Sequence, residues 1–194
     1  NKAARGLANE INTCIACNQA CLDHAFKNKV ASCLVNPRAC HETELHYDRT
    51  LKPKRIAVIG AGPAGLACAT TLAGRGHNVE LFESASEIGG QFNVAKRIPG
   101  KEGFHEPLRY FDSQIVRTGV RLHLNTRADA ARLIADKFDD VVLATGVVPR
   151  DPKIKGQDSA NVVSYIDVLH GNAKVGERVA VIGAGGIGFD VSEF

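Results

Sequence analysis

The chain has 194 residues, of which 44% are hydrophobic and 23% are charged, a composition typical of a globular protein with an ordinary core. Its 24 basic and 21 acidic residues give a net charge of +3, and only 6% of the residues are aromatic, which argues against a nucleic-acid-binding surface. No apolar stretch approaches the roughly 18 to 20 residues that span a bilayer, and the N-terminus has no secretory pattern. The sequence therefore predicts a cytoplasmic protein, in a reducing compartment, without nucleic-acid or membrane partners.

The two ends of the chain are unusual. It begins with Asn1, contains no Met, and ends at Phe194 inside a motif that is described below. We therefore expect the sequence to be a fragment of a longer polypeptide.

Three cysteines lie close together near the N-terminus, and a fourth follows further along. Their spacing is C-x2-C-x3-C-x11-C, through Cys14, Cys17, Cys21 and Cys33. In a reducing compartment such a group indicates metal ligands rather than disulfides. Structural zinc sites use two separated pairs, whereas an iron–sulfur cubane can take three ligands from one loop and a fourth from elsewhere. The spacing alone favours an iron–sulfur cluster over zinc by about two to one and leaves zinc open. Cys40 could substitute as a ligand, but we expect it to be a buried free thiol.

A stronger signal spans residues 55–83, RIAVIGAGPAGLACATTLAGRGHNVELFE. A short apolar run predicts a buried parallel strand, and Gly60, Gly62 and Gly65 then give the G-x-G-x-x-G turn that opens a helix. The free N–H groups at the start of that helix favour a pyrophosphate. The next strand ends in Glu83, where a carboxylate can accept hydrogen bonds from ribose hydroxyls. This unit predicts a dinucleotide-binding site.

Further elements follow in order. Apolar residues recur on one helical face between Phe104 and Ile115, and VRLHLN alternates like a half-buried strand. DDVVLATGVVP, residues 139–149, reads as an apolar strand that ends in small residues, which permits the close approach of a ligand or of backbone.

The end of the chain repeats its first glycine motif. RVAVIGAGGIGFD, residues 178–190, matches RIAVIGAGPAG and places Gly183, Gly185 and Gly188 in the same roles. Two such motifs about 120 residues apart indicate two nucleotide sites. One nucleotide would donate hydride, and the other would be a redox cofactor that can release electrons singly. Because zinc takes no electrons, this pairing favours the iron–sulfur interpretation of the cysteines.

Six stretches together resemble one family. INTCIACNQACLD, SCLVNPRACHE, GAGPAGLA, EIGGQFNVAKRIPGKEGF, ATGVVPR and VAVIGAGGIGFD closely resemble the bacterial NADPH-dependent 2,4-dienoyl-CoA reductases, to which trimethylamine and histamine dehydrogenases are related. The likeness runs from Ala3 to Asp190, and the cysteine spacing together with GGQFNVAKRIPGKE is its most specific part.

The resemblance implies an α/β protein with a Rossmann-like FAD/NAD(P)-binding fold of the disulfide-reductase type, preceded by a small cysteine-rich [4Fe-4S] segment. Residues 1–50 would bind the cluster, 51–150 would form the first part of an FAD domain, 151–177 would connect, and 178–194 would begin a truncated NAD(P)H domain. An N-terminal FMN-binding (β/α)8 barrel of the same polypeptide, absent from this sequence, would hold the substrate. Hydride would pass from NADPH to FAD, and electrons would then pass through the cluster to FMN, which reduces an unsaturated acyl-CoA.

The resemblance also assigns residues. The [4Fe-4S] ligands would be Cys14, Cys17, Cys21 and Cys33. The contacts to FAD and NADPH would come from Gly60, Gly62, Pro63, Ala64, Gly65, Glu83, Gly90, Gln91, Arg97, Ala128, Gly146, Gly183, Gly185 and Gly188. Among these, Glu83 would bind the FAD ribose, Ala128 would touch the adenine, and Gly146 would lie near the flavin. No group of His, Tyr or carboxylate side chains forms a convincing catalytic site, so we expect the substrate chemistry to lie in the barrel.

Two alternatives remain open. An amine dehydrogenase of the related type would bind ADP in place of FAD and would pass electrons outward, but it would have no need of the second glycine motif. The second alternative is a non-catalytic nucleotide-binding module that is held together by zinc. The colour of the purified protein separates these readings, since an iron–sulfur flavoprotein is brown with a flavin shoulder.

Overall fold

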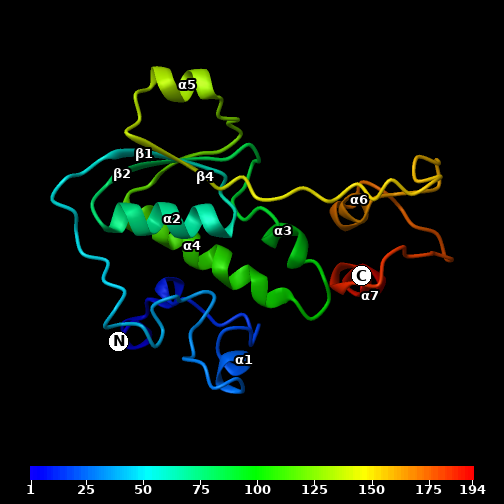
Figure 1. The fold of residues 1–194 in the computed structure, drawn as a ribbon, viewed down its shortest axis with the longest axis horizontal. Coiled ribbons are helices and arrows are strands. Elements are labelled where there is room, and N and C mark those ends of the chain that lie inside the picture. Colours follow the sequence, from blue (N-terminus) through cyan, green and yellow to red (C-terminus); the bar gives the residue numbers. More distant parts are fainter.

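The computed structural model describes all 194 residues and has a four-stranded parallel sheet at its centre (Figure 1). The strands are β1 (Arg55–Ile59), β2 (Asn78–Phe82), β3 (Arg121–His123) and β4 (Asp140–Leu143). The α-helices are α1 (Leu22–Ala25), α2 (Pro63–Gly74), α3 (Phe92–Ala95), α4 (His105–Thr118), α5 (Ala130–Ala135), α6 (Tyr165–His170) and α7 (Gly186–Glu193). Three short 3-10 helices are η1 (Ala3–Arg5), η2 (Ala8–Glu10) and η3 (Glu102–Phe104). None of the helices combines the length and apolar character needed to cross a membrane.

The sheet has the strand order β3-β2-β1-β4, and all three strand pairs are parallel. Parallel neighbours require crossover connections, and α2 supplies the one between β1 and β2. The predicted α/β class and the strand–turn–helix–strand unit at residues 55–83 are thereby confirmed. The strand predicted at 139–143 is also present, but β4 lies at the edge of the sheet and is largely exposed.

The core lies between the sheet and two helices. Helix α2 packs on one face of the sheet and α4 lies beside α2, while α5 stands on the opposite side (Figure 1). The buried cluster joins both central strands to both helices and consists of Ile56, Val58, Ala61, Leu66, Ala69, Val79, Leu81, Ile88, Ile115 and Val120. The helical face predicted from Phe104 to Ile115 therefore faces the core, and the half-buried Cys68 of α2 packs against the core cluster.

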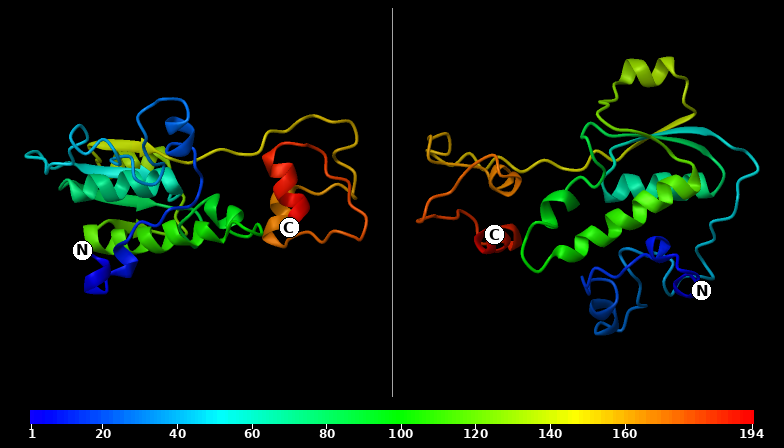
Figure 2. Two further views of the ribbon diagram at one scale, coloured as in Figure 1. Left: turned by 90° about the horizontal axis from the view of Figure 1, so that it is seen from below. Right: turned by 180° about the vertical axis from the view of Figure 1, so that it is seen from behind.

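Two parts of the chain extend from this body. The beginning of residues 1–50, at η2, packs against α4, and Figure 2 shows α6 and α7 next to each other at the far end of an extended segment. The Lys101 ammonium pairs with Asp190 of α7, and the Arg97 guanidinium donates to the Leu169 carbonyl at 2.6 Å. These contacts fix the C-terminal part of the chain against the loop that precedes α4.

The second glycine motif forms its helix but not its strand. Residues 178–182 have no strand conformation, and the apolar side chains of Val179, Val181 and Ile182 are 58%, 44% and 74% exposed. A buried parallel strand takes its backbone hydrogen bonds from neighbouring strands, and no other strand of these 194 residues lies beside it. Residues 178–182 therefore resemble residues 55–59 in sequence, but they do not pair with a neighbouring strand.

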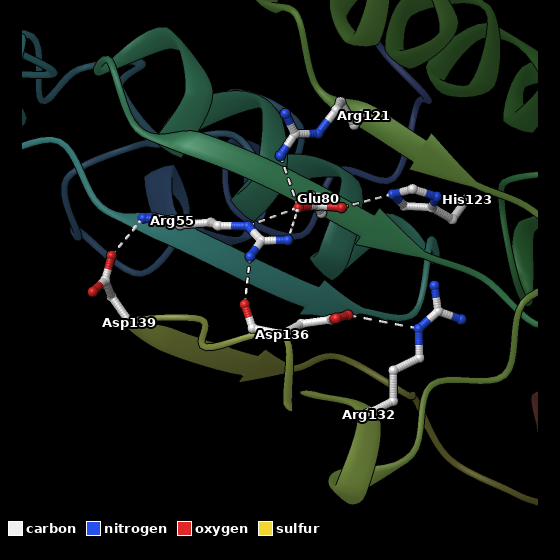
Figure 3. A network of polar contacts seen from close by, with 7 residues as sticks. All are labelled: Arg55, Glu80, Arg121, His123, Arg132, Asp136 and Asp139. Carbon is white, nitrogen blue, oxygen red and sulfur yellow. Dashed lines mark hydrogen bonds and ion pairs between the residues drawn. The ribbon is translucent and has the colours of Figure 1, made fainter. Parts of the chain in front are cut away.

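The face of the sheet opposite α2 carries a polar network around Glu80 (Figure 3). The carboxylate accepts hydrogen bonds from Arg55 at 2.8 Å, from Arg121 at 2.7 Å, and contacts the His123 ring nitrogen at 2.9 Å. Arg55 continues the network to the Asp136 carbonyl, next to α5. One carboxylate thus links β1, β2 and β3 on this face.

The stability of the chain should depend on the charge of Glu80. Burial would raise the pKa of this carboxyl, but the hydrogen bonds from Arg55, Arg121 and His123 outweigh burial and lower the pKa from 4.5 to about 2. A pKa lowered in the folded state adds stability above the unfolded-state value, and that stability is lost as the pH falls from about 4.5 towards 2. Because the partners of Glu80 are partly exposed to solvent, its ionised carboxylate contributes only about 2 to 3 kcal/mol to the free energy of unfolding.

Urea unfolding of the natural protein and of Glu80→Gln at pH 6 and at pH 3 measures this effect. Glu80→Gln should be less stable at pH 6. The difference should narrow at pH 3, because the carboxyl is then mostly protonated in the unfolded chain and folding must ionise it. A difference that is the same at both pH values would contradict the lowered pKa.

Candidate dinucleotide-binding site

The first glycine turn brings the end of β1 against the start of α2. Gly60 has φ +102°, and a Cβ built on it would lie 2.4 Å from the Ala144 carbonyl oxygen. A Cβ on Gly65 would lie 1.8 Å from the Gly60 carbonyl oxygen, whereas the space beside Gly62 is open. The first and third glycines are therefore required by close packing. The second leaves room for a ligand at the start of α2, where Pro63 and Ala64 are the first helical residues.

Glu83 stands at the end of β2 beside this turn. Its Oε2 accepts a hydrogen bond from the Ala61 amide at 2.8 Å, and its Oε1 accepts one from the Ala85 amide at 2.8 Å. Both bonds hold the carboxylate in one orientation. Oε1 also accepts a hydrogen bond from the Ser84 hydroxyl at 3.2 Å, so Oε2 is the oxygen that keeps a further lone pair for a ligand hydroxyl. The structure thus fixes Glu83 before any ligand binds.

A cleft of about 360 Å³ opens at this edge of the sheet. Three residues singled out from the sequence line it together: Gly60, Glu83 and Ala128. The remaining lining residues are Ile59, Phe82, Ser84, Thr126, Arg127 and Thr145. Ser84, Thr126 and Arg127 were not predicted, although their positions directly after β2 and shortly after β3 would place them at the carboxyl edge of a parallel sheet.

The other predicted cofactor residues lie in the surrounding loops. A Cβ on Gly90 would come within 3.1 Å of the Gly62 Cα, and the Gln91 amide nitrogen donates to the Val147 carbonyl at 3.0 Å. Gly146, with φ +74°, precedes that carbonyl in the segment after β4. The structure therefore brings Gly90 to the first turn and Gln91 to the segment that contains Gly146. Arg97 does not lie with these residues at the first turn, because its guanidinium donates a hydrogen bond to the Leu169 carbonyl of α6.

The second glycine turn repeats the backbone geometry of the first. Gly185 has φ −85° and ψ 179°, compared with −74° and 179° at Gly62. Gly183 has φ +123°, and a Cβ on Gly188 would lie 1.9 Å from the Gly183 carbonyl oxygen. The local sequence thus forms the same turn and helix start twice, even where no strand precedes it.

The cysteines lie in the N-terminal segment, outside the glycine turns. All six cysteines are free thiols, but Cys40 is exposed and the expectation that it is buried was wrong. The Ala16 amide donates a hydrogen bond to the Cys14 sulfur at 3.3 Å. The structure gathers no three His, Cys, Asp or Glu side chains into a metal-binding group, so Cys14, Cys17, Cys21 and Cys33 do not form an assembled site. Free thiols and an amide aimed at sulfur suit the donor chemistry of an iron–sulfur cluster. The role of the four thiols as cluster ligands remains a prediction from the sequence.

One glycine turn on a parallel sheet with a cleft at its carboxyl edge, and a second turn of the same geometry later in the chain, define an α/β protein of the dinucleotide-binding class. Residues 54–194 match the family described as pyridine nucleotide-disulphide oxidoreductase, and the chain belongs to this family. The family match confirms the predicted Rossmann-like FAD/NAD(P)-binding fold.

Several known proteins are similar to the chain over nearly its whole length. It is 38% identical to a metal reductase of Desulforamulus reducens, over 99% of this chain and 29% of the relative. It is 37% identical to an NADH oxidase of Thermoanaerobacter brockii, over 100% of this chain and 31% of the relative. The chain therefore spans about three tenths of the length of these relatives.

Solved structures give the same result. A 2-naphthoyl-CoA reductase in complex with 2-naphthoyl-CoA superposes with a TM-score of 0.94 and 38% identity, over 99% of this chain and 29% of that one. The 6-hydroxypseudooxynicotine amine oxidase of Pseudomonas geniculata superposes with a TM-score of 0.76 and 31% identity, over 90% and 28%. These relatives confirm the resemblance to acyl-CoA reductases and related amine-oxidising enzymes.

Proposed function

We propose that the chain is the electron-input part of an NAD(P)H-dependent flavoenzyme that reduces an unsaturated acyl-CoA. The observation that carries this proposal is the pair of glycine turns with the same backbone geometry in one chain. A protein that only binds one nucleotide has no use for the second turn. The similarity to a 2-naphthoyl-CoA reductase supports the thioester class of substrate.

The proposed roles follow from the positions of the residues. Gly60, Gly62 and Gly65 would receive the FAD pyrophosphate at the start of α2, and Glu83 would accept hydrogen bonds from the FAD ribose. The turn at 183–188 would receive the pyrophosphate of NADPH at the start of α7. When bound, FAD accepts hydride from a nicotinamide and can release the electrons singly.

The remaining parts of the proposal concern the ends of the chain. Cys14, Cys17, Cys21 and Cys33 would hold a [4Fe-4S] cluster in residues 1–50, and residues 51–150, 151–177 and 178–194 would be the FAD region, a connection and the start of the NAD(P)H region. The relatives are more than three times as long as the region they share with this chain. That length supports an N-terminal FMN-binding barrel of the same polypeptide, which would bind the acyl-CoA.

Anaerobic titration of the purified full-length protein with NADPH, and separately with NADH, tests this proposal. Bleaching of the flavin absorption by one of them is the expected result. If neither bleaches the flavin while an amine substrate does, the protein is an amine dehydrogenase of the related type. A colourless protein with bound zinc would support a non-catalytic module.

Replacing Glu83 should weaken the binding of FAD. Glu83→Ala removes a charge-assisted hydrogen bond to the ribose, a loss of about 1.5 to 3 kcal/mol, or about ten- to hundredfold in dissociation constant. Fluorescence titration of the apoprotein with FAD measures it. Glu87→Ala, a change four residues further along and outside the cleft, is the control and should bind FAD normally. Equal affinities in the two variants would show that other groups hold the ribose.

A further inference from the structure

The N-terminal segment, residues 1–50, has almost no hydrophobic core of its own. Ala20 is its only buried residue, and its regular elements are two 3-10 turns and a single helical turn. Such a segment cannot be held in place by apolar packing, because little apolar surface is removed from water. Specific polar contacts must determine where it lies.

Hydrogen bonds tie this segment to the rest of the chain in two places only. At its end, the Thr50 amide donates to the Arg75 carbonyl and the Arg75 guanidinium donates to the Asp48 carbonyl, after α2. Near its beginning, Arg109 and Glu106 of α4 bind residues 8–13. All four cysteines proposed as ligands lie between these two anchors.

The anchor on α4 is the denser of the two. The Arg109 guanidinium donates to the Ala8 carbonyl at 2.8 Å, to the Ile11 carbonyl at 3.1 Å and to the Thr13 hydroxyl at 3.1 Å. It also pairs with the Glu106 carboxylate at 2.7 Å, and that carboxylate accepts the Thr13 hydroxyl at 3.0 Å. One planar guanidinium therefore binds three residues of the segment and a carboxylate, which the point charge of a lysine cannot reproduce.

Thr13 is the residue immediately before Cys14. We propose that Arg109, oriented by Glu106, is a positioning residue. It fixes the start of the N-terminal segment, residues 1–50, on α4 and thereby sets the position of the Cys14 thiol. The cysteines have this meaning only under the proposed function, but the anchor itself does not depend on it. Arg109 hydrogen-bonds to none of the proposed cofactor residues, and its effect would reach Cys14 through Thr13.

Hydrogen–deuterium exchange of the full-length protein tests the anchor. The Glu10 amide donates to the Leu7 carbonyl and the Ile11 amide to the Ala8 carbonyl, each at 3.0 Å, so both report on the anchored turn. Arg109→Ala should speed exchange of these two amides by about ten- to hundredfold, the effect of losing a charge-assisted pair. Exchange in β1 and α2 should not change.

Arg117→Ala is the matched control, because Arg117 is on the same helix and hydrogen-bonds only to Gln114. Glu106→Gln is a milder second variant, which keeps the shape of the side chain and should give a smaller acceleration in the same amides. Unchanged exchange of Glu10 and Ile11 in Arg109→Ala, relative to Arg117→Ala, would overturn the proposal. So would an equal acceleration in β1, since that would indicate general unfolding.

Release of iron to a chelator supplies the second measurement. Arg109→Ala should lose iron several-fold faster than Arg117→Ala while retaining FAD equally well, and equal rates of iron loss would overturn the positioning role. If the natural protein holds no iron, the proposed cluster fails, and the exchange of Glu10 and Ile11 still decides whether Arg109 anchors the segment.

Discussion

Gly65→Ala should destabilise the protein and abolish FAD binding. The added methyl would lie 1.8 Å from the Gly60 carbonyl oxygen and 3.3 Å from the Ala144 side chain, so α2 would have to move away from the end of β1. That movement is opposed by Leu66 and Ala69 of the same helix, both of which are fully buried. Overpacking of this kind costs about 1 to 3 kcal/mol or more, and it displaces the helix start that would face the pyrophosphate.

Helix α2 provides its own control for this prediction. Gly74, the last residue of α2, has no atom within 4 Å of a built Cβ, and Gly74→Ala should be neutral or stabilise by up to about 1 kcal/mol. Thermal unfolding and FAD titration of both variants measure the difference. Gly188→Ala repeats the clash at the second turn and should leave FAD bound while NAD(P)H binds poorly. An FAD affinity of Gly65→Ala equal to that of Gly74→Ala would rule out the role given to the first turn.

The parts of the fold that the sequence predicts are those with local causes. The apolar run at 56–59 and the apolar positions Val79, Leu81 and Phe82 are typical of strands in a buried parallel sheet, and the glycines between them permit one tight turn. The helical face ending at Ile115 is likewise set by spacing along one element. For the same reason, the glycine turn forms at 183–188 without its strand, because the turn is local and strand pairing is not.

The contacts that sequence reasoning missed join residues far apart. Glu80 meets Arg55 and Arg121 across strands, and Arg109 meets Ala8 and Thr13 some hundred residues away. Charged residues on a strand or helix read as solvent-facing unless their partners are known. Arg127 in the cleft could have been expected, because the residues after β3 must lie at the same edge as Glu83.

The geometry of the cysteines could not be predicted from their spacing for a different reason. Spacing limits how far apart Cys14, Cys17 and Cys21 can lie, but it does not orient them. In a segment with one buried residue, ligand bonds would orient the thiols relative to one another, since metal binding and folding are coupled in such segments. Cys33 lies in a separate stretch of the chain, so it is the most informative of the four proposed ligands to remove.

Cys33→Ser in the full-length protein should separate hydride uptake from substrate reduction. The natural protein, purified anaerobically, should contain about four iron and four sulfide per chain, the content of one cubane cluster. Loss of one of four thiolate ligands should remove or cripple that cluster. The glycine turn at 60–65 should be unaffected, because Cys33 precedes it and belongs to the segment held by Arg109 and Arg75 rather than to the sheet.

The expected result for Cys33→Ser is a split in activity. NAD(P)H should still bleach the flavin, and an artificial acceptor that oxidises FAD directly should still be reduced at a near-normal rate. Reduction of a 2,4-dienoyl thioester should collapse, because electrons would no longer reach the barrel.

Cys40→Ser is the control, since Cys40 is also a free thiol of this segment but lies outside the proposed ligand set, and it should keep both its iron and its activity. If Cys40→Ser loses its iron and Cys33→Ser does not, the fourth ligand has been assigned to the wrong residue. If a cluster-free Cys33→Ser protein with bound FMN reduces the thioester normally, the cysteine segment has a structural role, because the electrons then have a route that does not pass through it.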